Sequence, residues 1–156
     1  MVSGSAAGIS VVTGVSLETA HAGEKAETTG NSPAKATFAA AAAAFAAGQD
    51  AQDRTGLQFE EVPAPKRLAP YAVAVAATVQ RGEADVAWGR LVLLYDPDGQ
   101  EGWEGFFRMV AYVRADVEPE MAADPLLGEV GWSWLSEALD AHVPGYAAPS
   151  LSLIHI

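Results

Sequence analysis

The clearest pattern along the chain is an alternation of apolar and polar side chains between residues 105 and 117. One set of alternate positions is apolar throughout, while the other set carries charged groups such as Arg108 and Arg114. A period of two is typical of a strand with one buried face. The apolar set is therefore predicted to face the core, and it consists of Phe107, Met109, Ala111, Val113, Ala115 and Val117.

The preceding stretch, Val86–Tyr95, is apolar on both faces apart from Arg90. This pattern predicts a central strand that is covered on both sides, with Trp88, like Leu91 and Leu93, in the interior. The Asp-Pro-Asp-Gly run at 96–99 has the chemistry of a type I turn, because Pro fixes φ at about −65° and Gly accepts a positive φ. We therefore predict a hairpin around which the rest of the chain is organised.

Two further stretches alternate in the same way and predict two more strands. Leu57–Val62 resembles a short edge strand, and it stops at Pro63-Ala64-Pro65 because proline cannot donate to a strand ladder. Residues 71–79 alternate larger side chains with alanine and threonine, which favours a long strand with a small-residue face. Four consecutive strands joined by short turns predict an antiparallel meander.

An alanine-rich helix is predicted before these strands. Ser32 can cap its first turn, Pro33 suits the first helical position, and the helix formers of residues 36–47 continue until Gly48, where the helix is expected to end. Phe38 and Phe45 lie seven residues apart on one face, so we expect this face to dock on the sheet.

A second helix is predicted at 130–142, where apolar residues recur at helical spacing opposite serine and acidic residues. This segment contains Trp132 and Trp134. The elements together predict an α+β fold, in which an antiparallel meander of about four strands is packed by an N-terminal Ala-rich helix and a C-terminal Trp-containing helix.

Both ends of the chain are expected to lie outside this domain. Residues 1–31 are rich in Gly, Ser, Thr and Ala and lack periodicity, which predicts a disordered segment. The final residues, 151–156, are what the sequencing-adapter sequence CTG TCT CTT ATA CAC ATC encodes codon for codon, and we interpret them as a non-native tail. The expected organisation is therefore a disordered segment at 1–31, a single α+β domain at 32–150 that is truncated at its C-terminus, and an adapter-encoded tail at 151–156.

Charge and cysteine content narrow the classes of function. Nine Lys and Arg residues stand against 20 Asp and Glu residues, and the net charge of −11 disfavours nucleic acid and anionic membranes as partners. The absence of Cys excludes disulfides, thiolate metal sites and a cysteine nucleophile, and it fits a cytoplasmic protein. No Lys or Arg follows Arg114, so the C-terminal part is acidic, either as a solvated face or as a docking surface for a basic partner.

No motif in the chain predicts catalysis. The Gly-Trp-Ser-Trp-Leu run at 131–135 lacks the second glycine of a nucleophile elbow, and the glycines at 99–105 alternate with acids that would repel a phosphate. The densest carboxylate cluster has a spacing that matches no calcium loop, and it consists of Asp116, Glu118, Glu120 and Asp124. We therefore expect no metal, cofactor or catalytic residue.

The non-core set of the final predicted strand has the composition of an interaction face, because it mixes guanidinium and aromatic groups. The alternative is that a helix covers this face and its arginines pair with local carboxylates. The candidate face consists of Phe106, Arg108, Tyr112 and Arg114.

The leading hypothesis is a non-catalytic binding or regulatory module with a protein partner. The alternative is a small-molecule-binding protein or enzyme with a pocket between the sheet and the 130–142 helix. The candidate pocket residues for this alternative are Glu118, Trp132 and Trp134.

Three runs in the chain resemble a known family. They are PAPKRLAPYA at 63–72, GRLVLLYDPDGQEGWEGFFRMVAYVRA at 89–115 and EPEMAADPLLGEVGWSWLSEAL at 118–139. By these runs the chain resembles an actinobacterial family known only as the domain of unknown function numbered 3000. The resemblance implies a further β-rich segment after the second helix, and it implies no established activity, cofactor or catalytic residue.

Overall fold

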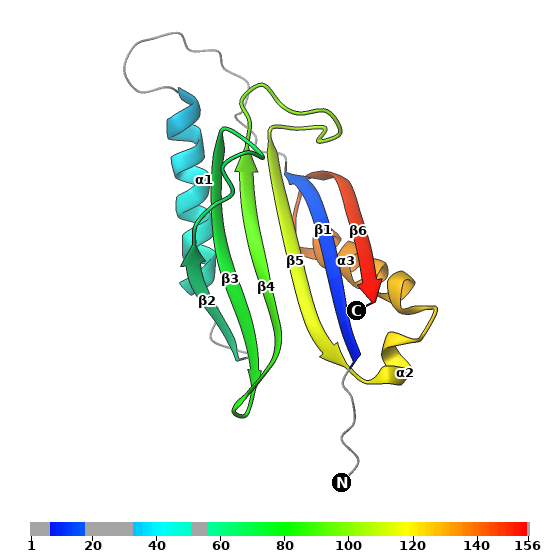
Figure 1. Ribbon diagram of the computed structural model, residues 1–156. Helices are drawn as coiled ribbons and strands as arrows, with labels where there is room; N and C mark the ends of the chain where they lie inside the picture. The colour runs from blue at the N-terminus through cyan, green and yellow to red at the C-terminus, as the bar shows by residue number, and fades with distance from the viewer. Residues whose placement is uncertain (1–6, 18–32, 51–55, 156) are drawn as a thin grey trace.

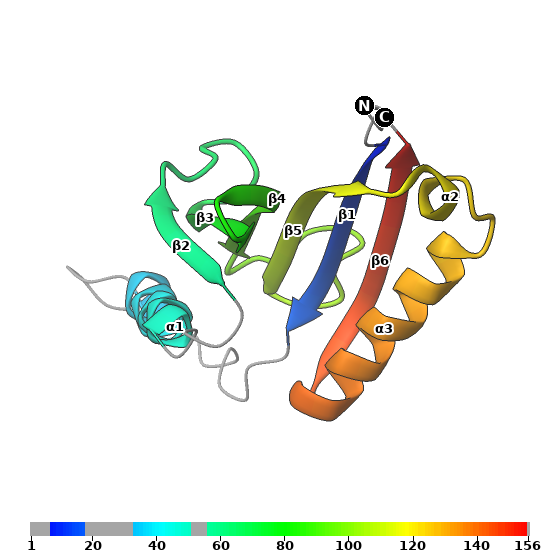
Figure 2. The same ribbon diagram turned by 90° about the horizontal axis from the view of Figure 1, so that it is seen from below.

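The computed structural model describes residues 7–17, 33–50 and 56–155. Its strands form one antiparallel sheet in the order β2-β3-β4-β5-β1-β6, and the helices α1 and α3 lie on the same side of that sheet (Figures 1 and 2). The elements are β1 Ala7–Leu17, α1 Pro33–Asp50, β2 Leu57–Val62, β3 Tyr71–Arg81, β4 Ala84–Tyr95, β5 Phe107–Val117, α2 Pro119–Ala122, α3 Leu127–His142 and β6 Tyr146–His155.

The predicted meander is confirmed for the four consecutive strands from β2 to β5. The turn between β4 and β5 has the expected geometry, because the Gly99 N–H donates to the Asp96 carbonyl at 3.0 Å and Gly99 has a φ of 70°. The Asp98 N–H also donates to the Asp96 side chain at 3.0 Å, which stabilises the turn.

The expectation of about four strands is wrong, because the described sheet has six. One of the added strands is β1, which lies in the segment that was predicted to be disordered. Its residues pair with β5, with Leu17 opposite Phe107, and with β6 on the other side. The glycines and threonine that weaken the side-chain pattern of this segment do not prevent pairing, since a ladder is made by backbone groups. Residues 1–6 and 18–31 of the predicted disordered segment lie outside the described residues.

The other added strand is β6, which includes most of the segment interpreted as an adapter-encoded tail. Leu151 pairs with Thr13, and Leu153 pairs with Val11. The sheet therefore extends beyond the predicted domain limits of 32–150 at both ends. The adapter origin of residues 151–156 stays a prediction.

The helix-side face of the sheet contains a core formed by β4, β5 and α1. Leu93, Tyr95 and Phe107 are buried there, and Phe38 and Phe45 of α1 pack against them. The Phe107 ring stacks on the Tyr95 ring with 4.4 Å between centroids, and burial raises the pKa of the Tyr95 hydroxyl. The expected docking of α1 through its two phenylalanines is confirmed, although α1 continues through Gly48 to Asp50.

The Trp-containing helix is also confirmed, and α3 begins three residues before the predicted start. It lies along β6 on the helix-side face, where the Tyr146 hydroxyl donates to the Asp140 carboxylate and this bond raises the pKa of Tyr146. None of its residues is buried. Within the described residues, no helix has the length and apolarity needed to span a bilayer.

On the opposite, loop-side face, the elements that the structure describes cover only one end. Ala74, Val92 and Leu94 are buried there beneath the connector between β2 and β3 and beneath Trp103. Towards the other end, Trp88 is 46% exposed, so the prediction that it lies deep in the core is wrong. Val113, on the helix-side face, is 40% exposed, which also contradicts its predicted burial. Strands β4 and β5 are longer than the elements that cover them.

Candidate functional site

The candidate interaction residues of β5 share the loop-side face because they occupy alternate positions of one strand. Pairing with β4 places Arg108 opposite Leu94, Tyr112 opposite Arg90, and Arg114 opposite Trp88. Phe106 precedes β5 and is partly exposed near the β4–β5 loop. The structure thus brings Arg108, Tyr112 and Arg114 into one row, but their surroundings differ.

Arg108 is held within the fold by hydrogen bonds. Its Nη1 donates to the Ser16 hydroxyl at 2.9 Å and to the Ala148 carbonyl at 2.7 Å, and its Nη2 donates to the Ser150 hydroxyl at 3.2 Å. Burial lowers the pKa of its guanidinium. The side chain therefore connects β5 with β1 and β6, and the partners that it finds are hydroxyl and carbonyl groups instead of the expected carboxylates.

The Arg108→Lys variant is expected to reduce the free energy of unfolding by about 1–2 kcal/mol, because a single ammonium cannot reproduce the guanidinium fork. Ser16 is 1% exposed, so a lost bond to its hydroxyl is not replaced by bulk water. Urea denaturation measures the change. The matched control is Arg114→Lys, at an exposed position of the same strand face, which should change stability by less than about 0.5 kcal/mol. Equal effects of the two substitutions would contradict the structural role of Arg108.

Tyr112 orients an exposed indole. Its hydroxyl forms a 3.0 Å hydrogen bond with the Ser10 hydroxyl of β1, and its ring lies 5.5 Å from the Trp88 ring at an interplanar angle of 54°. Ser10 is itself buried. The tilted aromatic pair therefore presents Trp88 to solvent from a fixed position on the sheet.

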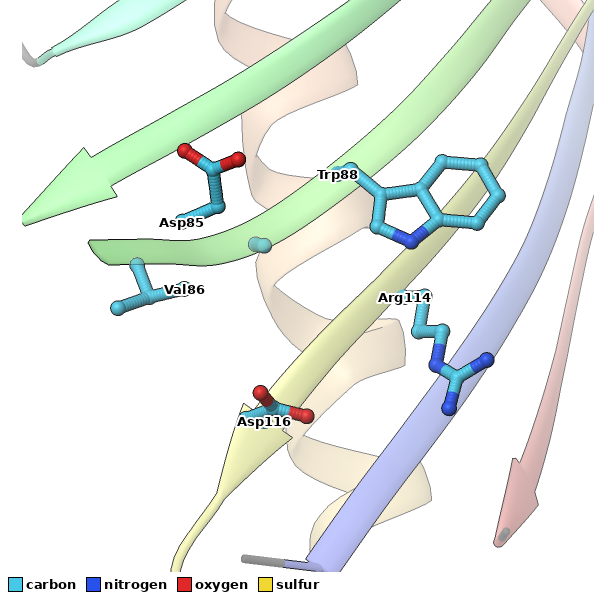
Figure 3. A pocket seen from close by; sticks show the side chains of 6 residues that line it. Asp85, Val86, Trp88, Arg114 and Asp116 are labelled. Atoms are coloured by element: carbon cyan, nitrogen blue, oxygen red, sulfur yellow. The ribbon is translucent and has the colours of Figure 1, made fainter. Parts of the chain in front are cut away.

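A shallow pocket lies beside this indole at the open end of β4 and β5. Its volume is about 180 Å³, and Figure 3 shows the carboxylates of Asp85 and Asp116 at its two ends with Trp88 and Arg114 along one side. Pockets for small molecules usually have volumes of about 300–1,000 Å³, so this one fits a single side chain of a larger partner. The lining residues are Asp85, Val86, Ala87, Trp88, Arg114 and Asp116.

The guanidinium of Arg114 is exposed, and no hydrogen bond or ion pair engages it within the part of the chain that the structure describes. Arg90 is also exposed and pairs with Tyr112 across the ladder, so the two arginines flank the aromatic pair. Arg108 and Arg114, which share a strand face and a residue type, therefore differ in their surroundings: the first is bonded within the fold, and the second is exposed.

Sequence reasoning missed Trp88 and Asp85 as members of this site. Trp88 was assigned to the core because the strand is apolar on both faces, a pattern that does not show where its cover ends. One signal was present, since Arg90 interrupts that apolar strand. An arginine at this position indicates that its side of the strand reaches solvent at that point.

The residues of the alternative set are exposed on α3 and before α2. Glu118 is the exposed residue before α2, while Trp132 and Trp134 are exposed on α3. None of the three lines the pocket described above. Among residues 7–17, 33–50 and 56–155, no group of three or more His, Cys, Asp or Glu side chains is arranged to hold a metal ion.

In the described part of the chain, fold and site together define an α+β domain with a six-stranded antiparallel sheet, one face of which is left half uncovered by these residues. The chain belongs to the family described as "Protein of unknown function (DUF3000)", whose profile matches residues 34–153. The match runs from the second residue of α1 into β6, and β1 lies outside it. No curated protein and no solved structure matches the chain.

Proposed function

We propose that this protein is a non-catalytic binding module and that a protein partner contacts the uncovered half of its loop-side face. We call this area the open surface and define it by Trp88, Arg90, Tyr112 and Arg114. The observation that supports the proposal most strongly is the exposed Trp88 indole, held by Tyr112 and placed beside the free guanidinium of Arg114. Trp, Tyr and Arg are the residue types that contribute most to binding energy in protein interfaces.

An aliphatic side chain from the unpredicted strand β1 extends the open surface. Val12 is exposed, and its pairing with Tyr112 puts it on the loop-side face. The resulting area combines apolar groups, two arginines and the pocket with its two carboxylates. This composition suits a protein segment with mixed polarity better than a nucleic acid backbone, since the whole chain carries a net charge of −11.

The candidate face inferred from the sequence is thereby revised. Tyr112 and Arg114 stay in the proposal, Arg108 is removed because three hydrogen bonds hold its guanidinium against β1 and the β6 segment, and Phe106 lies at the other end of β5. We propose the cytoplasm as the compartment, since the sequence has no Cys and so cannot form the disulfides that are typical of oxidising compartments. A pocket between the sheet and residues 130–142 has no observation in its favour.

A comparison of variants in the native host tests the open surface. Tagged full-length protein is cross-linked in cells and purified as wild type, as Trp88→Ala, as Arg114→Glu and as the control Lys35→Glu, which reverses an exposed charge on α1. We expect a partner that is captured by wild type and Lys35→Glu and lost from the two open-surface variants. The purified partner should then bind Trp88→Ala about tenfold or more weakly than wild type.

Two results would overturn this proposal. The first is the same set of captured proteins for all four baits. The second is a purified partner whose affinity for Trp88→Ala and Arg114→Glu equals its affinity for wild type. Far-ultraviolet circular dichroism of the variants confirms that any loss comes from the surface and not from unfolding.

A further inference from the structure

An apolar stripe on α3 faces solvent and is not used by the fold or by the open surface. Leu126, Val130 and Trp134 follow one another at intervals of four residues, which places them on one side of the helix. Their exposed fractions are 57%, 38% and 68%. We call this set the outer stripe. Trp134 is the most exposed large hydrophobic residue described in the chain.

The contact of α3 with the sheet is made by a neighbouring stripe. Leu127, Leu135 and Leu139, which lie on one side of the helix at spacings of eight and four residues, are half-buried, and α3 lies against β6. The apolar part of α3 is therefore wider than the area that the sheet covers. An uncovered apolar row of this kind on a helix is typical of a protein contact.

Charge restricts what can cover the outer stripe. Glu129 and Glu137 lie beside it on the exposed surface of α3, and the Ser133 hydroxyl is 3.5 Å from the Glu137 carboxylate. No Lys or Arg follows Arg114 in the sequence, so no lysine or arginine of α2, α3 or β6 offsets these acids. A second copy of the chain would bring a like-charged helix to the same place, and an anionic bilayer would be repelled.

We propose that the outer stripe binds a basic amphipathic helix of a protein partner. The stripe runs from Leu126 to Trp134, eight helical steps or about 12 Å along the helix axis, which corresponds to two to three turns of a partner helix. Packed helices lie about 8–10 Å apart, close enough for aliphatic side chains of the partner to cover Trp134 and Val130. Lysines or arginines beside them reach Glu129 and Glu137. This surface is separate from the open surface, because α3 lies on the helix-side face of the sheet (Figure 2) and strand register puts the open surface on the loop-side face.

A designed peptide provides the first test. The probe is a fluorescein-labelled peptide of about 16 Leu and Lys residues with leucine at helical spacing, which is long enough to form a helix on binding. Titration with the full chain should give saturable anisotropy and an affinity that falls as salt rises. Trp134→Ala should weaken binding about tenfold or more, because it removes the largest side chain of the stripe. Trp88→Ala, on the other face, should bind like wild type, which separates this result from the test of the open surface.

A charge exchange provides the second test. Glu129→Lys with Glu137→Lys should weaken binding of the Leu/Lys peptide and introduce binding of the corresponding Leu/Glu peptide. The proposal is overturned if Trp134→Ala leaves the affinity unchanged or if a scrambled Leu/Lys peptide without an apolar face binds equally well. It is also overturned if the chain binds vesicles of phosphatidylcholine and phosphatidylserine and not the peptide.

Discussion

Replacing Phe107 by Ala is expected to lower the free energy of unfolding by about 3–5 kcal/mol. The Phe107 side chain is 2% exposed and stacks on Tyr95, and the α1 phenylalanines pack on the same cluster. Truncation removes its buried apolar area and leaves a cavity between the sheet and α1. Domains of this size are commonly stable by about 5–15 kcal/mol, so the variant should be partly unfolded or melt far earlier. Urea and thermal denaturation measure the loss.

Phe106→Ala is the matched control for this substitution. Phe106 is the same residue type one position earlier, but it is 37% exposed and precedes β5. Its truncation should cost about 1 kcal/mol or less, because much of its ring is already in contact with water. A Phe107→Ala cost as small as that of Phe106→Ala would show that the helix-side core is not packed as described.

Gly89→Ala is expected to lower the free energy of unfolding by about 2–3 kcal/mol, although alanine is an ordinary residue in strands. A Cβ at Gly89 would lie 2.6 Å from the Tyr112 carbonyl oxygen, which belongs to the backbone of the paired strand. Strand β4 or β5 must therefore shift to accept the methyl group. The shift displaces Tyr112 and with it the orientation of Trp88, so binding at the open surface should weaken in the same variant.

The control is Gly131→Ala, which adds the same methyl group to α3. No atom lies within 4 Å of a Cβ at that position, and alanine favours a helix over glycine by about 1 kcal/mol. This variant should be as stable as wild type or more stable. Chemical denaturation of both proteins checks the contrast, and a Gly89→Ala protein with wild-type stability would show that β4 and β5 are not as close as described.

The four strands from β2 to β5 could be predicted because each carries its own periodicity. The predicted bounds of the strand Leu57–Val62 agree with those of β2. The turn at 96–99 could be predicted because its residue types permit only a few backbone angles. The other two strands could not be found in this way. In β1 the pattern is weakened by Gly8, Gly14 and Thr13, and its order depends on pairing with two distant strands.

Gly14 shows why the pairing of β1 cannot be inferred from its local sequence. A Cβ there would lie 2.9 Å from Nη2 of Arg108, so glycine leaves room for the guanidinium that joins β5 to β1 and β6. Read alone, Gly14 only weakens a strand pattern. Its role is evident only once Arg108, 94 positions further along the chain (108 − 14), is placed above it.

The candidate site, like the sheet, could be predicted only where it depends on the periodicity of one strand. Alternation along β5 correctly grouped Tyr112 with Arg114, since side chains two apart share a face. Arg108 is bonded and Arg114 is exposed because of where β1 and β6 lie. The hydrogen bond that holds Tyr112 likewise depends on Ser10 of β1. Exposure of Trp88 depends on where the covering connector ends, which no short-range pattern specifies.

The central position of β1 between β5 and β6 has a consequence for synthesis of the protein. During translation β1 leaves the ribosome first, yet Ser16 meets Arg108 only 92 residues later, and Thr13 meets Ser150 only 137 residues later. At about 5–20 residues per second, the strand waits about 5–20 s for its first neighbour. The meander can assemble in the meantime from strands that are adjacent in sequence. Insertion of β1 between β5 and β6 is therefore expected to follow assembly of the meander, because its contacts close the longest loops in the sheet.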